Sequence, residues 1–167
     1  MKIAWLFLAT LLLPAAVFCQ ASEYVGYRYK SVIPETVLPN GVKNLGGGLV
    51  GDFYAKPVWG VAEVSKGKVR MLWLEKATAE DERGVTEWEI SDVLSFPNIP
   101  TDQELLIASG PGECKENGKT TNDLVVHVQF LKTQMAYKTL KAWRADVKAG
   151  RFVALDAKNV KCRYDEP

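Results

Sequence analysis

The fold is decided by the stretch from Val58 to Glu75, which reads VWGVAEVSKGKVRMLWLE. Two apolar runs flank a short polar turn centred on Gly67. Glycine adopts the positive φ of a tight hairpin turn without steric cost, and valine and tryptophan suit a pleated, half-buried surface. The pattern therefore predicts a β-hairpin at the middle of the fold.

Further apolar runs with a two-residue period lie on both sides of this hairpin, separated by turn residues. The segments expected as strands are Glu23–Ile33, Val85–Phe96, Glu104–Ser109, Asp123–Leu131, a second hairpin over Leu140–Asp156, and Val160–Tyr164. A charged connection is expected at Lys76–Gly84. No segment keeps a helical period over several turns. The spacing predicts an all-β domain of roughly eight to ten strands, a small antiparallel barrel or sandwich built from hairpins.

The first 21 residues have the composition of a secretory signal peptide. Ile3–Phe18 is apolar but too short to span a membrane, and small residues stand at Cys19 and Ala21. We therefore expect cleavage after Ala21, which leaves one secreted or periplasmic domain of residues 22–167. A lipidated N-terminus at Cys19 is the disfavoured alternative, because a phenylalanine precedes it where a small residue is usual.

The charges of the chain are balanced. It carries 21 Lys and Arg against 20 Asp and Glu, and the loss of Lys2 with the signal peptide leaves it formally neutral. Nucleic acids and anionic membranes select a basic face, so neither is expected as the main partner. Residues 22–167 contain no apolar run of the length that a membrane helix needs. The expected partner is a protein or a component of the cell envelope.

Two cysteines remain beyond the signal peptide, Cys114 and Cys162. In an oxidising compartment an isolated pair without a C-x-x-C motif is expected to form a structural disulfide. Cys114 lies in the turn-rich segment 110–123, GPGECKENGKTTND, where Asn117-Gly118 favours a tight turn. The disulfide is therefore predicted to tie a long loop to the last strand.

The sequence lacks the motifs of common catalytic and cofactor sites. It has no G-x-S-x-G, H-E-x-x-H or P-loop motif, and its one histidine, His127, has no neighbours at metal-ligand spacing. On the mixed face of its strand, His127 is expected to be exposed or hydrogen-bonded. Gly46–Gly51 matches G-x-G-x-x-G formally, but no βαβ unit surrounds it, so a bulge or a close backbone approach is expected. No catalytic residue, metal site or cofactor is predicted.

These observations favour a non-enzymatic exported binding protein that meets its partner through loops or edge strands. A surface segment held rigidly by a disulfide often carries recognition. The candidate binding loop consists of Lys115, Glu116, Asn117, Gly118 and Lys119.

Two alternatives stay open. One is a barrel that holds a small apolar ligand against some of its tryptophans, although a shared tryptophan core is favoured. The tryptophans concerned are Trp59, Trp73, Trp88 and Trp143. The other is a hydrolase that uses paired carboxylates from Glu87, Glu89 and Asp92.

In size, signal peptide, single disulfide and β-rich pattern the chain resembles small exported barrels of the lipocalin or lysozyme-inhibitor kind. The G-x-W motif is absent from its first strand, where Gly26 in VGYRY comes nearest, so no family is assigned.

Overall fold

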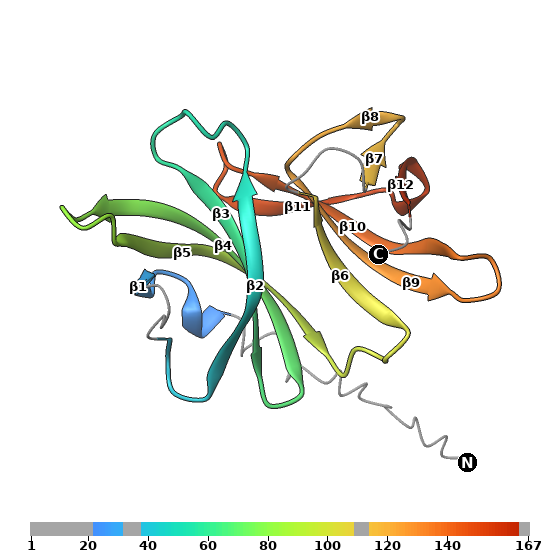
Figure 1. The fold of residues 1–167 in the computed structure, drawn as a ribbon, viewed down its shortest axis with the longest axis horizontal. Helices are drawn as coiled ribbons and strands as arrows, with labels where there is room; N and C mark the ends of the chain where they lie inside the picture. The colour runs from blue at the N-terminus through green and yellow to red at the C-terminus, as the bar shows by residue number, and fades with distance from the viewer. Residues whose placement is uncertain (1–21, 32–37, 109–113, 164–167) are drawn as a thin grey trace, which may run out of the picture.

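The computed structural model describes residues 22–31, 38–108 and 114–163. The predicted signal peptide, with Cys19 and the cleavage position after Ala21, lies outside the described residues. Antiparallel β-sheet makes up most of the described chain, which contains no α-helix (Figure 1). The predicted all-β fold built from hairpins is confirmed, and the sheets do not close, which is consistent with the sandwich of the two predicted architectures.

Three sheets contain the strands of the described residues. The central sheet has the order β1-β5-β4-β3-β2, the second β11-β10-β9-β6, and the third β12-β7-β8. The strands are β1 (Arg28–Ser31), β2 (Val42–Val50), β3 (Trp59–Lys66), β4 (Val69–Glu80), β5 (Thr86–Pro97), β6 (Gln103–Ala108), β7 (Cys114–Glu116), β8 (Lys119–Thr120), β9 (Leu124–Leu131), β10 (Ala136–Asp146), β11 (Arg151–Leu155) and β12 (Val160–Cys162). Two 3-10 turns accompany them, η2 (Ser22–Tyr24) and η3 (Ala157–Asn159).

The predicted central hairpin is formed by β3 and β4. Lys66 pairs with Val69, and Gly67 between them has a φ of 60°, so the turn has the conformation that glycine allows. β4 continues to Glu80 because its far half still pairs with β5. The charged connection predicted at Lys76–Gly84 is therefore wrong in its first half.

The two edge strands of the central sheet differ from the prediction. The first strand, β1, begins later than predicted, because η2 and a turn at Gly26, where φ is 83°, replace its start, and the predicted end at Val32 and Ile33 lies outside the described residues. On the opposite edge, the glycine segment lies inside β2, with the expected bulge between Asn44 and Gly46. An ideal Cβ at Gly47 would stand 2.5 Å from the Val61 carbonyl oxygen, so the expected close backbone approach is present too.

The third sheet replaces most of the loop predicted at 110–123. β7 and β8 form a hairpin around Asn117-Gly118, and β12 pairs with β7 so that Cys162 lies opposite Cys114. The predicted disulfide joins these two cysteines. The loop prediction failed because these strands are two or three residues long, too short to show a period.

The central sheet is buried on both faces, so the tryptophans do not share one core. Leu72 and Leu74 face the second sheet, in a cluster that Trp59 and Trp143 border. Trp73 lies between them in sequence and points to the opposite face, where it packs with Tyr24, Tyr29, Met71 and Ile90. The prediction of a shared tryptophan core is wrong because alternate residues of a strand face opposite sides of the sheet.

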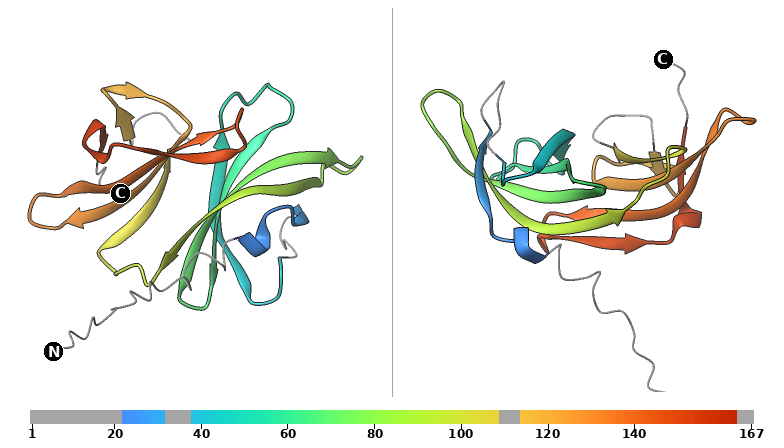
Figure 2. Two further views of the ribbon diagram at one scale, coloured as in Figure 1. Left: turned by 180° about the vertical axis from the view of Figure 1, so that it is seen from behind. Right: turned by 90° about the horizontal axis from the view of Figure 1, so that it is seen from below.

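Hydrogen bonds join the two larger sheets where β5 meets β11. Asp92 Oδ2 accepts from the Phe152 backbone N–H at 2.7 Å, and the Ser91 hydroxyl donates to the Gly150 carbonyl at 2.7 Å. Figure 2 shows the blue-to-green strands of the central sheet on one side of this junction and the yellow-to-red strands on the other. The two larger sheets therefore lie at opposite ends of the molecule.

Candidate functional site

The predicted binding loop is a short hairpin at the end of the molecule formed by the third sheet. Lys115 pairs with Thr120 and Glu116 pairs with Lys119, while Asn117 and Gly118 form the two-residue turn. The φ angles of the turn residues are 49° and 77°, both in the left-handed region that tight hairpin turns require. The Asn117 backbone N–H also donates to the Asn159 carbonyl at 2.8 Å, which fixes the turn against η3.

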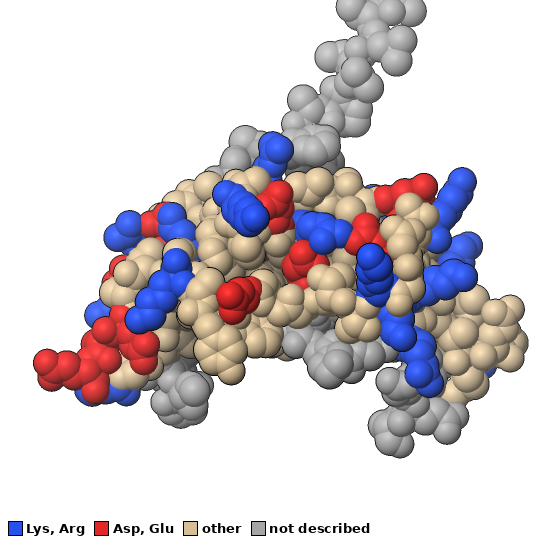
Figure 3. Space-filling model, turned by 90° about the horizontal axis from the view of Figure 1, so that it is seen from above, with Lys and Arg blue, Asp and Glu red and all other residues tan. Residues whose placement is uncertain are grey.

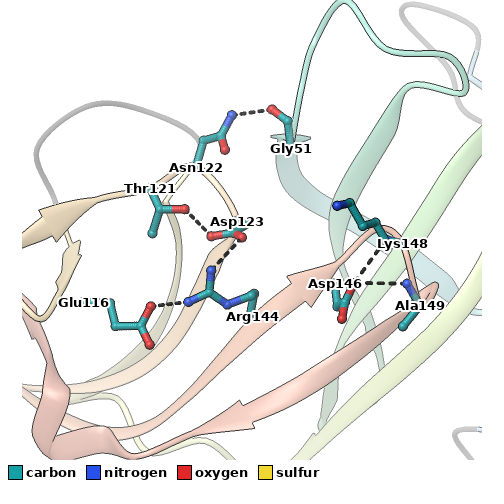
Figure 4. Close-up of polar contacts among 9 residues, drawn as sticks. All are labelled: Gly51, Glu116, Thr121, Asn122, Asp123, Arg144, Asp146, Lys148 and Ala149. Atoms are coloured by element: carbon teal, nitrogen blue, oxygen red, sulfur yellow. Dashed lines mark hydrogen bonds and ion pairs between the residues drawn. The ribbon is translucent and has the colours of Figure 1, made fainter.

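An ion-pair network holds the base of this hairpin (Figure 4). The Arg144 guanidinium of β10 contacts the Glu116 carboxylate and also Asp123 Oδ2, the latter at 3.2 Å. Thr121 donates to the same aspartate. Beside the network, the Asn122 side chain donates to the Gly51 carbonyl across the sheets at 2.5 Å. Glu116, one of the predicted loop residues, thus forms an ion pair with Arg144 within the protein.

Three of the remaining predicted loop residues, Lys115, Asn117 and Gly118, border a hollow with basic side chains, and Lys119 is not part of its lining. The hollow has a volume of about 380 Å³. It is lined by Lys115, Asn117, Gly118, Lys158, Asn159, Lys161 and Arg163. None of these described lining residues carries a carboxylate, and the three lysines are exposed. The arrangement concentrates positive charge at a position whose strands are joined by the disulfide.

A second region of interest lies on the central sheet, on the face turned away from the second sheet. A hollow of about 320 Å³ opens there between the edge strands β1 and β2. It is lined by Tyr29, Ser31, Asn44, Gly46, Gly47, Gly48, Leu49, Gly60, Val61, Ala62, Glu75 and Trp88. Glycines supply much of β2 and β3 here, so the hollow exists where side chains are missing.

Glu75 is the carboxyl group of this hollow. Its side chain is only 6% exposed, and the Tyr29 hydroxyl donates to Oε2 at 2.5 Å. Burial raises the pKa of Glu75 to about 7, and the hydrogen bond from Tyr29 opposes that rise. Burial, followed by the charge of Glu75, raises the pKa of Tyr29 as well, so Tyr29 keeps its proton and acts as a donor.

Comparisons with family models, with curated proteins and with solved structures find no match to this chain. No group of three or more His, Cys, Asp or Glu side chains in the described part of the chain could hold a metal ion. No helix in the described ranges has the length and apolar character to cross a membrane. The function has to be inferred from the chain's own residues.

A larger hollow of about 630 Å³ adjoins the one over Glu75. It is lined by Leu49, Lys56, Pro57, Val58, Ala77, Thr78, Ala79, Glu80, Thr86 and Trp88. Leu49 and Trp88 line both hollows, so the two share a wall. Trp88 therefore borders open space, whereas Trp73 is fully buried.

The three carboxylates considered for a hydrolase have other roles. Glu89 accepts from Arg28 and from Lys76, and Glu87 lies 3.8 Å from the Arg28 guanidinium. Asp92 accepts from the Phe152 backbone and belongs to the junction between the sheets. None of the three lines either hollow of the central sheet. The structure therefore does not bring them together around a shared space.

His127 does not fit either expected role. Both of its ring nitrogens are buried without a hydrogen-bond partner among the described residues, and its ring packs against Phe96. Burial lowers the pKa of His127, and the charges of Lys141 and Arg70 lower it further. The prediction of an exposed or hydrogen-bonded histidine is wrong because this side chain lies at the border of the core between the sheets.

Sequence reasoning missed Glu75 and Tyr29. One signal for Glu75 was present, since it follows Met71 and Trp73 in two-residue steps and thus shares their apolar face. A carboxylate in that register is expected to be buried and to need a partner. No local signal identified the partner, which lies on another strand 46 residues away.

Proposed function

We propose that this protein is an exported, non-enzymatic binding protein that recognises an anionic partner through the basic hollow beside the β7–β8 hairpin. The observation that carries the proposal is the gathering of Lys115, Lys158 and Lys161 around one hollow. These lysines come from β7, η3 and β12, which the disulfide and strand pairing hold together. The partner would present carboxylate, phosphate or sulfate groups, on an acidic protein or a component of the cell envelope.

The distribution of charge supports this proposal. Lys and Arg side chains gather on the right of Figure 3, the side where the third sheet lies in Figure 1, and Asp and Glu side chains gather at the left tip. The nearby carboxylates Glu116 and Asp123 are already paired with Arg144. Arg144 compensates one of these two negative charges, so the three lysines outnumber the one that remains and can attract an anionic surface.

The proposal is tested by binding of poly-L-glutamate to the exported protein at low and physiological salt. The variant with Lys115, Lys158 and Lys161 changed to Gln is compared with a matched triple that changes Lys30, Lys43 and Lys68, all exposed and all on the N-terminal half. We expect the first triple to weaken binding by at least about tenfold and the second by less than about twofold. Equal losses in the two triples, or no binding by the wild type, would overturn the proposal.

A second candidate function is the binding of a small ligand on the central sheet. The observation that favours it is the pair of hollows that meet at Leu49 and Trp88. Aromatic and aliphatic walls with a few polar groups are typical of small-molecule sites. Quenching or enhancement of tryptophan fluorescence on addition of a ligand, lost in Trp88→Leu, would test it.

A further inference from the structure

Gly60 marks a point in the smaller hollow where three chemically distinct groups converge. An ideal Cβ built on Gly60 would lie 3.4 Å from Glu75 Oε1, 3.5 Å from the Gly48 carbonyl oxygen and 3.5 Å from Trp88 Cζ3. These are ordinary contact distances, so the three groups surround the space directly beside the Gly60 Cα. The Cβ position itself can hold only a side chain, because it lies within bonding distance of that Cα, and a ligand atom would lie farther out in the hollow. Two of the three neighbours are hydrogen-bond acceptors and the third belongs to an aromatic ring.

One of the two carboxylate oxygens of Glu75 remains available to a ligand in the hollow. Tyr29 donates to Oε2, whereas Oε1 receives no hydrogen bond from any described residue. The side chain is more than nine-tenths buried and lines the hollow, and its Oε1 would need a donor once a ligand covered it. The hollow therefore presents an acceptor that a ligand donor would satisfy.

We propose that the smaller hollow, where it lies over Gly60 between Glu75 and Trp88, binds the ammonium group of a ligand whose apolar part lies along Leu49 and Trp88 and extends into the larger hollow. The proposal rests on the second candidate function, the binding of a small ligand on the central sheet. An ammonium group has three donors and no acceptor, which matches the acceptors that meet here. The ring of Trp88 adds a cation–π contact, which is worth more in a desolvated position.

Other ligand groups fit the hollow over Gly60 less well. A carboxylate or phosphate would meet the Glu75 carboxylate and the Gly48 carbonyl, both of them negative or partly negative. A neutral hydroxyl has one donor for two acceptors. An apolar group would leave Oε1 buried without a donor. The positive charge and the several donors of an amine thus distinguish it from these groups.

The larger hollow accounts for the apolar part of the ligand. The wall that it shares with the smaller hollow consists of Leu49 and Trp88, and further apolar lining comes from Pro57, Val58, Ala77 and Ala79. Lys56 and Glu80 are the charged side chains of its lining. A chain of several methylene groups would extend from the ammonium group along this wall, and the burial of its apolar surface would stabilise binding.

The proposal is tested with three eight-carbon probes, n-octylamine, n-octanol and octanoate, by isothermal titration calorimetry at pH 8. Glu75 is largely ionised at that pH, because burial raises its pKa only to about 7. Tyr29 is the other titratable group among the described residues that line the smaller hollow. We expect n-octylamine to bind at least about tenfold more tightly than n-octanol and octanoate to bind most weakly.

Three variants locate the ammonium group. Glu75→Gln keeps the size of the side chain and should bring the affinity for n-octylamine down to that for n-octanol. Gly60→Ala adds a methyl group at ordinary contact distances between Glu75 and Trp88 and so narrows the hollow there, and this variant should fold normally and lose the preference for the amine. Glu80→Gln removes a carboxylate from the larger hollow only and should keep the preference.

The outcomes separate this proposal from the one it rests on. If n-octylamine and n-octanol bind the wild type equally, the apolar ligand site stands and the ammonium assignment is overturned. If Glu80→Gln removes the preference and Glu75→Gln does not, the ammonium assignment is also overturned. If none of the probes binds the wild type, both the small-ligand function and the ammonium site are overturned.

Discussion

The Tyr29 hydroxyl of β1 donates a hydrogen bond to Glu75 of β4, across the intervening strand β5. This contact places a carboxyl group beside the apolar cluster that contains Tyr29 and Trp73, on the face of the central sheet that the second sheet does not cover. Burial raises the pKa of Glu75 to about 7. The protein therefore holds an acid that changes its charge near neutral pH.

This pKa predicts a loss of stability as the pH rises. Glu75 ionises near pH 4.5 in the unfolded chain and near pH 7 in the folded protein, so between these values the folded state binds more protons. The free energy of unfolding should then fall as the pH rises from 4.5 to 7, by up to about 3 kcal/mol from this group. Urea unfolding at pH 5 and pH 8 measures it, with Glu75→Gln expected to lack this part of the fall.

Tyr29→Phe gives the matched control for that prediction. The hydrogen bond from Tyr29 lowers the pKa of Glu75, so its removal should raise this pKa further and extend the fall in stability to higher pH. If wild type and Glu75→Gln lose the same free energy between pH 5 and pH 8, Glu75 does not titrate as described.

His127 predicts a pH dependence of the opposite sign. Its pKa is lowered in the folded protein from 6.5, first by burial and then by Lys141 and Arg70. Below pH 6.5 the histidine binds a proton more readily in the unfolded chain than in the folded protein. The free energy of unfolding therefore falls as the pH is lowered. His127→Leu should remove this fall and also add about 1 kcal/mol at pH 8, because two unpaired nitrogens disappear.

Urea unfolding of wild type and His127→Leu at pH 5.5 and pH 8 checks this prediction. The gain from the substitution should be larger at pH 5.5 than at pH 8. A smaller gain at pH 5.5 would mean that the folded protein stabilises the charged imidazole, against the placement of this side chain beside Phe96.

The parts of the fold that the sequence predicts are those with a local cause. The turn at Gly67 and the turn at Asn117-Gly118 each depend on residues that accept positive φ. The disulfide between Cys114 and Cys162 could be predicted by counting, since these are the two cysteines that follow the predicted signal peptide. These features need no knowledge of how the sheets pack.

The parts that escape prediction depend on contacts between distant segments. In the run MLWLE, both faces of the strand are apolar, so periodicity separates Leu72 from Trp73 without showing which face meets the second sheet. Tyr29 and Glu75 are brought together only because the central sheet places β1 and β4 on either side of β5. The three lysines of the basic hollow likewise come from separate elements that strand pairing assembles.

The disulfide predicts a large contribution to stability. Cys114 and Cys162 are 48 residues apart, and closing a loop of that length in the unfolded chain stabilises the folded state by about 4 kcal/mol in the chain-entropy model. Changing both cysteines to Ser should lower the free energy of unfolding by a similar amount. The same variant should lose poly-L-glutamate binding at temperatures where it remains folded, because β7 and β12 are then held only by strand pairing.

Two glycines of neighbouring strands predict opposite responses to alanine. A Cβ at Gly47 would stand 2.5 Å from the Val61 carbonyl oxygen, which no side chain tolerates, so β2 must move away from β3. A Cβ at Gly60 would meet its neighbours at 3.4 Å or more. Gly47→Ala should therefore lower the free energy of unfolding by about 2 kcal/mol and Gly60→Ala by less than about 1 kcal/mol, as measured by urea unfolding. Equal losses would show that the β2–β3 pair is looser than its register implies.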